Sequence, residues 1–185
     1  TRKLEAVLAN IAEGVTLVDA QGRVLLVNDG FMWLYGFPAE LAKPGTPLAD
    51  FVRDRLRRGD LRAGDEPVGT EEDLEGAVQR RVQHLLATPS RSYEEPRPGG
   101  RIVHVQRRRL PDGLLVSTYT DVTEQRQHER ELAMLATAID QVGDSVEIST
   151  PDYKLVYVNP AFTRLTGYAA HEAIGKTPQQ LLRSD

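Results

Sequence analysis

Four side chains in the first part of the chain could contact a small ligand: Trp33, Tyr35, His104 and Arg107. Aromatic rings can line an apolar pocket, and an arginine can pair with a carboxylate through two hydrogen bonds. Alternation along a strand places Arg107 on the same face as two valines of its own segment, which would direct it into a pocket. The arginine run 107–109 fits a solvated, edge-protecting strand end equally well. His104 could face either water or the inner surface of a sheet.

The sequence contains no arrangement of residues that is typical of catalysis. It has no cysteine, which excludes disulfides, thiolate metal sites and cysteine nucleophiles. It has no phosphate-binding glycine loop, no His-Glu-x-x-His zinc motif and no serine nucleophile elbow. We therefore expect no catalytic residue and no metal site, and a regulatory rather than an enzymatic role.

Composition narrows the range of partners and locations. Hydrophobic residues make up 40% of the chain, charged residues 27%, and the net charge is -4. A nucleic-acid partner usually requires a basic face, so this balance gives no reason to expect one. No apolar run approaches the ~18 residues that a membrane span needs. We expect a cytoplasmic protein without a membrane span in this region.

The opening of the chain recurs near its end at a constant offset of 131 residues. Four of the matched pairs are Val15 with Val146, Asn28 with Asn159, Phe31 with Phe162, and Gly36 with Gly167. So many matches in one register indicate two copies of one structural unit. We expect the second copy to be incomplete, because the counterpart of Asp121 would lie beyond Asp185. Each asparagine stands between a strand and a helix, where an N-cap role explains it.

The first copy has a readable order of elements. Short aliphatic runs at 15–19 and 23–27 predict two strands, and the intervening residues suit a hairpin turn. Residues 31–35, 47–56 and 71–87 predict helices, the last with an apolar stripe and acidic residues at its start. Residues 90–94, 101–110 and 114–120 predict three more strands. This order predicts an α+β fold: a five-stranded antiparallel sheet with helices on one face.

The segment between the two copies predicts a helical coiled-coil linker. Asp121 and Glu124 have the spacing of a capping box at the start of this helix. The helix then shows apolar residues at heptad spacing, and the same pattern precedes the first copy. This apolar seam comprises Leu4, Leu8, Ile11, Leu132, Leu135, Ile139 and Val142. An exposed apolar seam favours self-association, so we expect a parallel homodimer.

Several segments together resemble the PAS domain family. They are the segments at 27–31 and 158–162 (VNDGF and VNPAF), those at 34–37 and 165–168 (LYGF and LTGY), and the terminal Asp121-Val122-Thr123. The resemblance implies an N-terminal helix over 1–13, a complete PAS domain over 14–121, a helical linker over 122–143, and the N-terminal part of a second PAS domain over 144–185.

The resemblance also implies a role in signalling. In PAS proteins the Asp-x-Thr motif ties the last strand to the output helix, so Asp121, Thr123 and Glu124 are expected to couple the domain to a downstream output domain. Proteins similar to the first copy commonly precede histidine kinase cores, and others precede enzymes that make or degrade cyclic di-GMP. A ligand-free PAS unit serving as a dimerisation spacer is the third alternative.

The resemblance also bears on cofactors and ligands. Some PAS relatives bind flavin through a reactive cysteine. This chemistry is excluded here, since the chain has no cysteine. Haem-binding relatives use a histidine on the long helix, but His84 lies off the apolar stripe of its helix, so we expect no cofactor in the first copy. The segment 174–178 is similar to one that covers the cofactor in flavin-binding PAS domains, but Gln179 and Gln180 depart from that pattern. A flavin in a full second copy, and a small-molecule ligand in the first, are left open.

Overall fold

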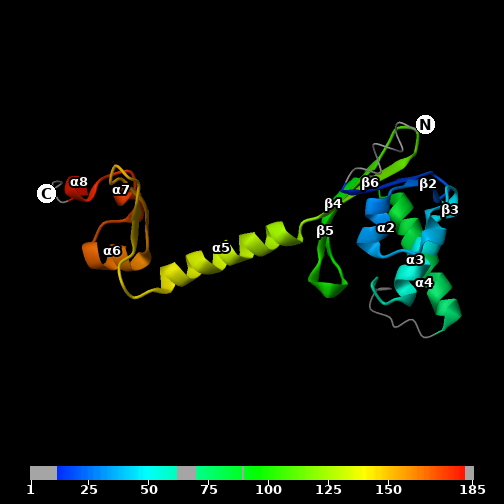
Figure 1. Ribbon diagram of the computed structural model, residues 1–185, viewed down its shortest axis with the longest axis horizontal. Helices are drawn as coiled ribbons and strands as arrows, with labels where there is room; N and C mark the ends of the chain where they lie inside the picture. Colours follow the sequence, from blue (N-terminus) through cyan, green and yellow to red (C-terminus); the bar gives the residue numbers. More distant parts are fainter. Residues whose placement is uncertain (1–11, 62–69, 89, 182–185) are drawn as a thin grey trace. The chain divides into compact units, whose positions relative to one another are not determined.

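The computed structural model describes residues 12–61, 70–88 and 90–181. Leu4, Leu8 and Ile11, which we expect in the apolar seam, lie outside the described residues. The chain divides into two compact units, residues 1–124 and 125–185, and each is described here by itself (Figure 1).

The first unit is built on one antiparallel sheet with the strand order β3-β2-β1-β6-β5-β4. The strands are β1 (Gly14–Val18), β2 (Arg23–Val27), β3 (Thr46–Pro47), β4 (Ser90–Pro96), β5 (Ile102–Arg109) and β6 (Leu115–Asp121). The five predicted strands are confirmed, and β3 is an additional strand at the edge of the sheet. It has only two residues, which pair with Arg23 and Val24, so it is too short to give a pattern in the sequence.

The helices α2 (Asp29–Tyr35), α3 (Leu48–Arg57) and α4 (Glu71–Ala87) gather on one face of this sheet (Figure 1). Two short 3-10 helices, η1 (Ala39–Ala42) and η2 (Pro98–Gly100), lie in the connections. The predicted cap role of Asn28 is confirmed, because its Oδ1 accepts from the Phe31 amide at 3.1 Å. The same oxygen accepts from the Val15 amide at 2.7 Å, so one side chain joins the start of α2 to β1.

The core of the first unit is a cluster of aromatic rings between the sheet and the helices. Phe31 lies at its centre, with ring centroids 5.0 Å from Tyr35, 5.3 Å from Phe37, 6.0 Å from Phe51 and 4.7 Å from Tyr119. Alternate residues of the central strands point into this cluster. In the first half of β5 these residues are Val103 and Val105, which are fully buried. The helix-facing side of the sheet is therefore the interior of the unit.

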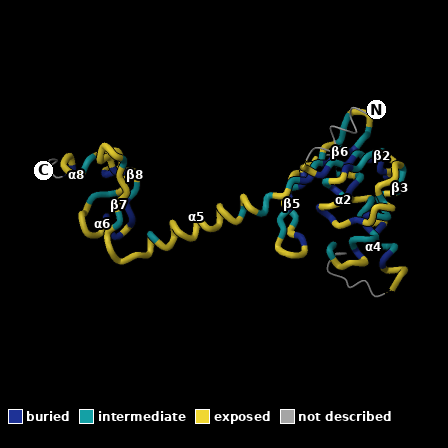
Figure 2. Tube along the Cα trace, in the orientation of Figure 1, coloured by how far each residue is buried: buried dark blue, intermediate teal, exposed yellow. Residues whose placement is uncertain are grey.

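The long helix α5 (Thr123–Gln141) follows β6 directly, as the sequence predicts. Its residues are almost all exposed along its length (Figure 2). In the second unit it is followed by β7 (Glu147–Ser149), β8 (Leu155–Val158), α6 (Pro160–Thr166), α7 (Ala170–Ala173) and α8 (Pro178–Leu181). Asn159 repeats the capping role of Asn28, because its Oδ1 accepts from the amides of Phe162 and Val146.

Candidate functional site

A small cavity lies between the inner face of the sheet and helices α3 and α4, and we call it the inner cavity. Its volume is about 60 Å³, and its walls combine aromatic and aliphatic side chains with three arginines and one glutamate. Pockets that enclose drug-sized ligands usually measure ~300–1,000 Å³. The inner cavity therefore has room for a ligand of only a few heavy atoms, because the aromatic cluster fills the remaining interior.

Two of the four predicted pocket residues line the inner cavity, namely Tyr35 and Arg107. The prediction was wrong for Trp33, whose side chain is 68% exposed. Successive residues of a helix point about 100° apart, so α2 buries Phe31 and Tyr35 and turns Trp33 toward solvent. The prediction of a pocket position was also wrong for His104. Its side chain lies on the outer face of the sheet and shares a 2.8 Å hydrogen bond with Ser92.

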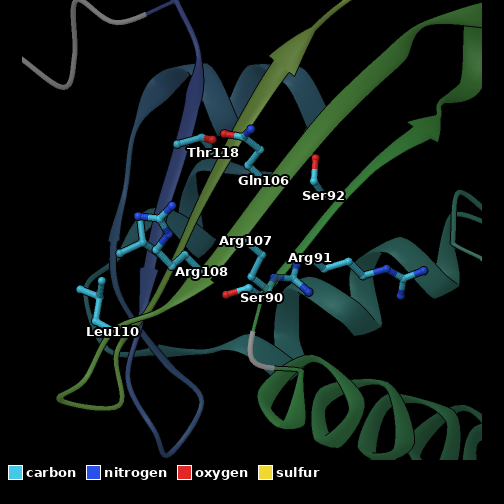
Figure 3. Close-up of a pocket in the computed structure, with 9 residues that line it drawn as sticks. Ser90, Arg91, Ser92, Gln106, Arg107, Arg108, Leu110 and Thr118 are labelled. Atoms are coloured by element: carbon cyan, nitrogen blue, oxygen red, sulfur yellow. The ribbon is translucent and has the colours of Figure 1, made fainter.

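A larger hollow of about 690 Å³ lies along β4, β5 and β6 (Figure 3). It is lined mainly by outward-facing side chains such as Ser92, Gln106 and Thr118, several of which are exposed. Figure 3 also shows the neighbouring side chains of Arg107 and Arg108 leaving β5 in different directions. Arg107 borders this hollow too, but its Nε reaches the buried Ser117 hydroxyl on the inner face, which agrees with the alternation predicted for this strand.

Arg107 and Arg81 bring two guanidinium groups to the inner cavity. The Nε of Arg107 donates to the buried Ser117 hydroxyl at 3.2 Å. The Nε of Arg81, on α4, is buried and has no hydrogen-bond partner. Within the part of the chain that the structure describes, neither arginine forms an ion pair with a carboxylate. Sequence reasoning missed Arg81, because only the apolar stripe of α4 gave a signal.

A second set of charges beside the inner cavity forms ion pairs, and we call it the buried ionic cluster: Arg55, Asp60, Glu95 and Arg97. Arg55 pairs with Glu95 and, at 3.1 Å, with Asp60. Arg97 pairs with Asp60 at 2.8 Å, and both side chains are only 5% exposed. The Tyr35 hydroxyl donates to Glu95 at 3.0 Å, and the Arg55 and Arg97 cations lie 4.8 and 4.3 Å from the centre of its ring.

The electrostatics of this cluster follow from its burial. Burial raises the pKa of Asp60, but hydrogen bonds from Arg97 and Arg55 outweigh it, so the pKa lies below its ordinary value. Burial is also the main cause of the raised pKa of Tyr35, with further contributions from Tyr119 and Glu95. Asp60 reaches its partners because Gly59 adopts a left-handed φ of 70° just after α3. The sequence gives no signal for this cluster, since its members come from separate elements.

His84 lies near the end of α4 with an exposed side chain. That it does not bind haem stays a prediction. Among the described residues no three histidine, aspartate or glutamate side chains are placed to hold a metal ion.

At the start of α5, four hydrogen bonds join the helix to the sheet. The Thr123 hydroxyl accepts from the Ile102 amide at 2.9 Å, and the Val122 amide donates to the Ile102 carbonyl at 2.9 Å. The Asp121 carboxylate accepts from the Thr123 amide at 3.0 Å and also from its hydroxyl. The side chain of Asp121 thus accepts hydrogen bonds from Thr123, two positions further along the chain. It does not form the capping box that its spacing to Glu124 predicts. Glu124 lies in the first turn of α5 with an exposed side chain.

Arg101 connects this junction to α2, and sequence reasoning missed it. Its Nε lies 3.3 Å from a carboxylate oxygen of Asp121. Its Nη1 donates to the Leu34 carbonyl at 3.3 Å, and its guanidinium carbon lies 4.6 Å from the centre of the Trp33 ring. One side chain therefore contacts both the end of the cavity-lining helix and the base of α5.

The first unit is an antiparallel sheet that holds a small cavity under its helices and continues into a long helix. A family model described as PAS fold matches residues 8–130, and a second with the same description matches residues 133–185. The chain therefore belongs to the PAS fold family.

Three solved structures illustrate the similarity of this chain to known proteins. A domain of a sensory box histidine kinase/response regulator from Geobacter sulfurreducens is 16% identical, with a TM-score of 0.38 over 65% of this chain and 92% of that one. The PAS domain of an HTR-like protein from Haloarcula marismortui is 22% identical, with a TM-score of 0.34 over 65% and 95%. The PAS domain of Bordetella pertussis BvgS is 16% identical, with a TM-score of 0.44 over 74% and 96%. Across the residues that the structure describes, no helix is long and apolar enough to cross a membrane.

We expect Asp60→Asn to lower the free energy of unfolding by about 3 kcal/mol or more at neutral pH, because Arg55 and Arg97 would lose a buried carboxylate partner. Urea unfolding measures this loss. Glu71→Gln is the matched control: it breaks the exposed pair with Arg57 and should cost under about 1 kcal/mol.

The effect of Asp60→Asn should also depend on pH. Because the pKa of Asp60 is lowered in the folded state, its stabilising contribution is present above the unfolded value near 3.8 and is lost as pH falls through the folded pKa. The two proteins should therefore converge in stability at low pH. If Asp60→Asn and Glu71→Gln lowered the free energy of unfolding equally at neutral pH, Asp60 would not be the buried ion-pair partner that we describe.

Proposed function

We propose that this chain is the cytoplasmic sensory region of a larger signalling protein, with a histidine kinase as its output domain in cis. In this proposal residues 14–121 form the sensing PAS domain, 122–143 a helical linker, and 144–185 the N-terminal part of a second PAS domain. The observation that carries the proposal is the continuous set of contacts from the inner cavity through Arg101 to the start of α5.

The proposed signal begins at α2. Phe31 and Tyr35 lie on this helix and line the inner cavity, so a change in cavity occupancy acts on α2 directly. Arg101 bonds to the end of α2 and pairs with Asp121. Asp121 in turn holds Thr123, the first residue of α5. A two-state linker needs only a few kcal/mol of differential interaction, which a few such polar contacts can supply.

The proposed output element is a parallel homodimer through the apolar seam. Leu132, Leu135 and Val142 are 68%, 50% and 39% exposed, and Ile139 is half-buried. Their heptad spacing matches the seam of a parallel coiled coil. A second copy of the same helix would cover these side chains and let a rotation of α5 pass to the output domain.

An alternative output is a diguanylate cyclase or phosphodiesterase, which the same helix would serve equally well. A ligand-free dimerisation spacer is favoured by a different observation, the small volume of about 60 Å³ that the aromatic cluster leaves. A spacer needs the seam but needs no connection from the cavity to α5. No cofactor is proposed for the first PAS domain, and a flavin in a complete second domain is left open.

The junction itself can be tested with Thr123→Val, which removes the hydroxyl that accepts from Ile102. We expect hydrogen exchange at the amides of Ile102 and the first turn of α5 to quicken by about fivefold, because one hydrogen bond contributes about 1 kcal/mol to local closure. Thr118→Val, on the outer face of β6, is the control and should leave both regions protected. Unchanged exchange in Thr123→Val would show that the hydroxyl does not hold the helix to the sheet.

The seam can be tested by Leu135→Glu/Ile139→Glu. Two buried charges in each helix should abolish the dimer that we expect at micromolar concentration. Light scattering on wild type, this variant and Gln127→Glu/Thr137→Glu separates the seam from net charge, since both variants add two negative charges. A monomeric wild type, or a seam variant that still dimerises, would remove the proposed interface.

A further inference from the structure

Two positive charges at the inner cavity have no counterpart among the described residues. The cavity walls include Arg55, Arg81, Arg107 and one carboxylate, that of Glu95. Arg55 and Glu95 pair with each other, and Glu95 also accepts from Tyr35. Arg81 and Arg107 are left, and the only hydrogen bond that the structure shows for either guanidinium runs to a neutral hydroxyl, that of Ser117.

The guanidinium groups of Arg81 and Arg107 both interact electrostatically with one side chain of the cavity wall, that of Tyr93. Arg81, Arg107 and Tyr93 all line this cavity. Burial raises the pKa of Tyr93, and the positive charges of Arg107 and Arg81 oppose that rise. Both cations therefore interact electrostatically with the Tyr93 hydroxyl. Placing cations beside an apolar interior without a partner is costly, and a bound anion removes much of this cost.

The rest of the cavity wall is apolar. Phe31, Phe51 and Leu85 face the same space, and the volume of about 60 Å³ admits only a few heavy atoms. A guanidinium pair suits a carboxylate, which accepts two parallel hydrogen bonds from an arginine. Aromatic and aliphatic walls suit a short hydrocarbon tail, which inorganic anions lack.

We propose that the inner cavity binds a short-chain monocarboxylate, of about two to four carbon atoms, with Arg81 and Arg107 holding the carboxylate and the aromatic cluster holding the tail. This inference rests on the proposed sensory function and names the class of ligand that would act on α2. Arg81 and Arg107 are binding residues in this proposal, and the buried ionic cluster provides a neutral wall beside them.

The experiment is calorimetric titration of the whole chain with propionate at constant ionic strength, with propionamide and nitrate as comparison ligands. We expect propionate to bind with a dissociation constant between about 10 μM and 1 mM, in the range for a ligand of so few atoms. Propionamide lacks the charge and nitrate lacks the tail, so both should bind at least about tenfold more weakly.

Arg107→Met and Arg81→Met should each weaken propionate binding by about tenfold or more, since each removes a charge-assisted hydrogen bond. The matched controls are Arg108→Met and Arg80→Met, which remove exposed arginines at the adjacent positions and should leave the dissociation constant unchanged. Arg81→Met should also leave the melting temperature of the free protein unchanged or higher, because it removes a half-buried cation that has no carboxylate partner among the described residues.

Three results would overturn the proposal: no propionate binding, equal binding of propionate and propionamide or nitrate, or equal weakening by the control variants. A lower melting temperature in Arg81→Met with unchanged binding would make Arg81 a structural residue and overturn it as well. These outcomes are separate from the proposed coupling, because hydrogen exchange at the Ile102–Thr123 junction does not depend on which ligand the cavity takes.

Discussion

The first unit depends on a single constraint: polar and charged groups that lie against the aromatic cluster must find partners there. The Tyr35 ring packs beside Phe31, so its hydroxyl is carried into the interior, where it donates to Glu95. Glu95 then requires a cation, and Arg55 supplies it. Asp60 completes the arrangement by pairing with Arg55 and Arg97. The interior thus holds a neutral group of charges directly beside an apolar cavity.

In the described part of the chain Arg81 and Arg107 have no carboxylate partner, and Arg107 donates only to the neutral Ser117 hydroxyl. A buried polar group without a partner is uncommon in folded proteins and often marks a functional site. Arg55 and Arg97 do pair with carboxylates, although the Nε of Arg97, like that of Arg81, is buried without a hydrogen-bond partner. The need of charged groups beside the aromatic cluster for a partner of opposite charge thus accounts both for the buried ionic cluster and for the proposed binding of a carboxylate.

Much of the fold was predictable because it depends on local patterns. The constant offset between the copies and the two asparagine caps gave the organisation of the chain, and alternation along β5 placed Arg107 on the inner face. The edge strand β3 was missed because two residues carry no periodicity. Trp33 was misplaced because a helix of seven residues gives too little pattern to fix which aromatic side chain is buried.

The candidate site was less predictable, because its polar contacts join residues far apart in the sequence. Asp60 follows α3, whereas Arg97 follows β4, and no spacing in the sequence connects them. Arg101 contacts the Leu34 carbonyl, a backbone atom that no sequence pattern identifies as a partner. The alternation that places Arg107 on the same face as the valines of β5 puts His104 on the opposite, outer face, so its position could have been predicted from the sequence.

The central claim is that a change at the inner cavity reaches α5 through Arg101, and amide chemical shifts test it most directly. Tyr35→Phe removes one hydroxyl from the cavity wall and leaves the ring in place. The account predicts that this substitution shifts the Thr123 amide resonance in the otherwise wild-type chain, and that the shift disappears when Arg101→Leu is also present. A Thr123 resonance that does not respond to Tyr35→Phe, or that responds equally in both backgrounds, would contradict it.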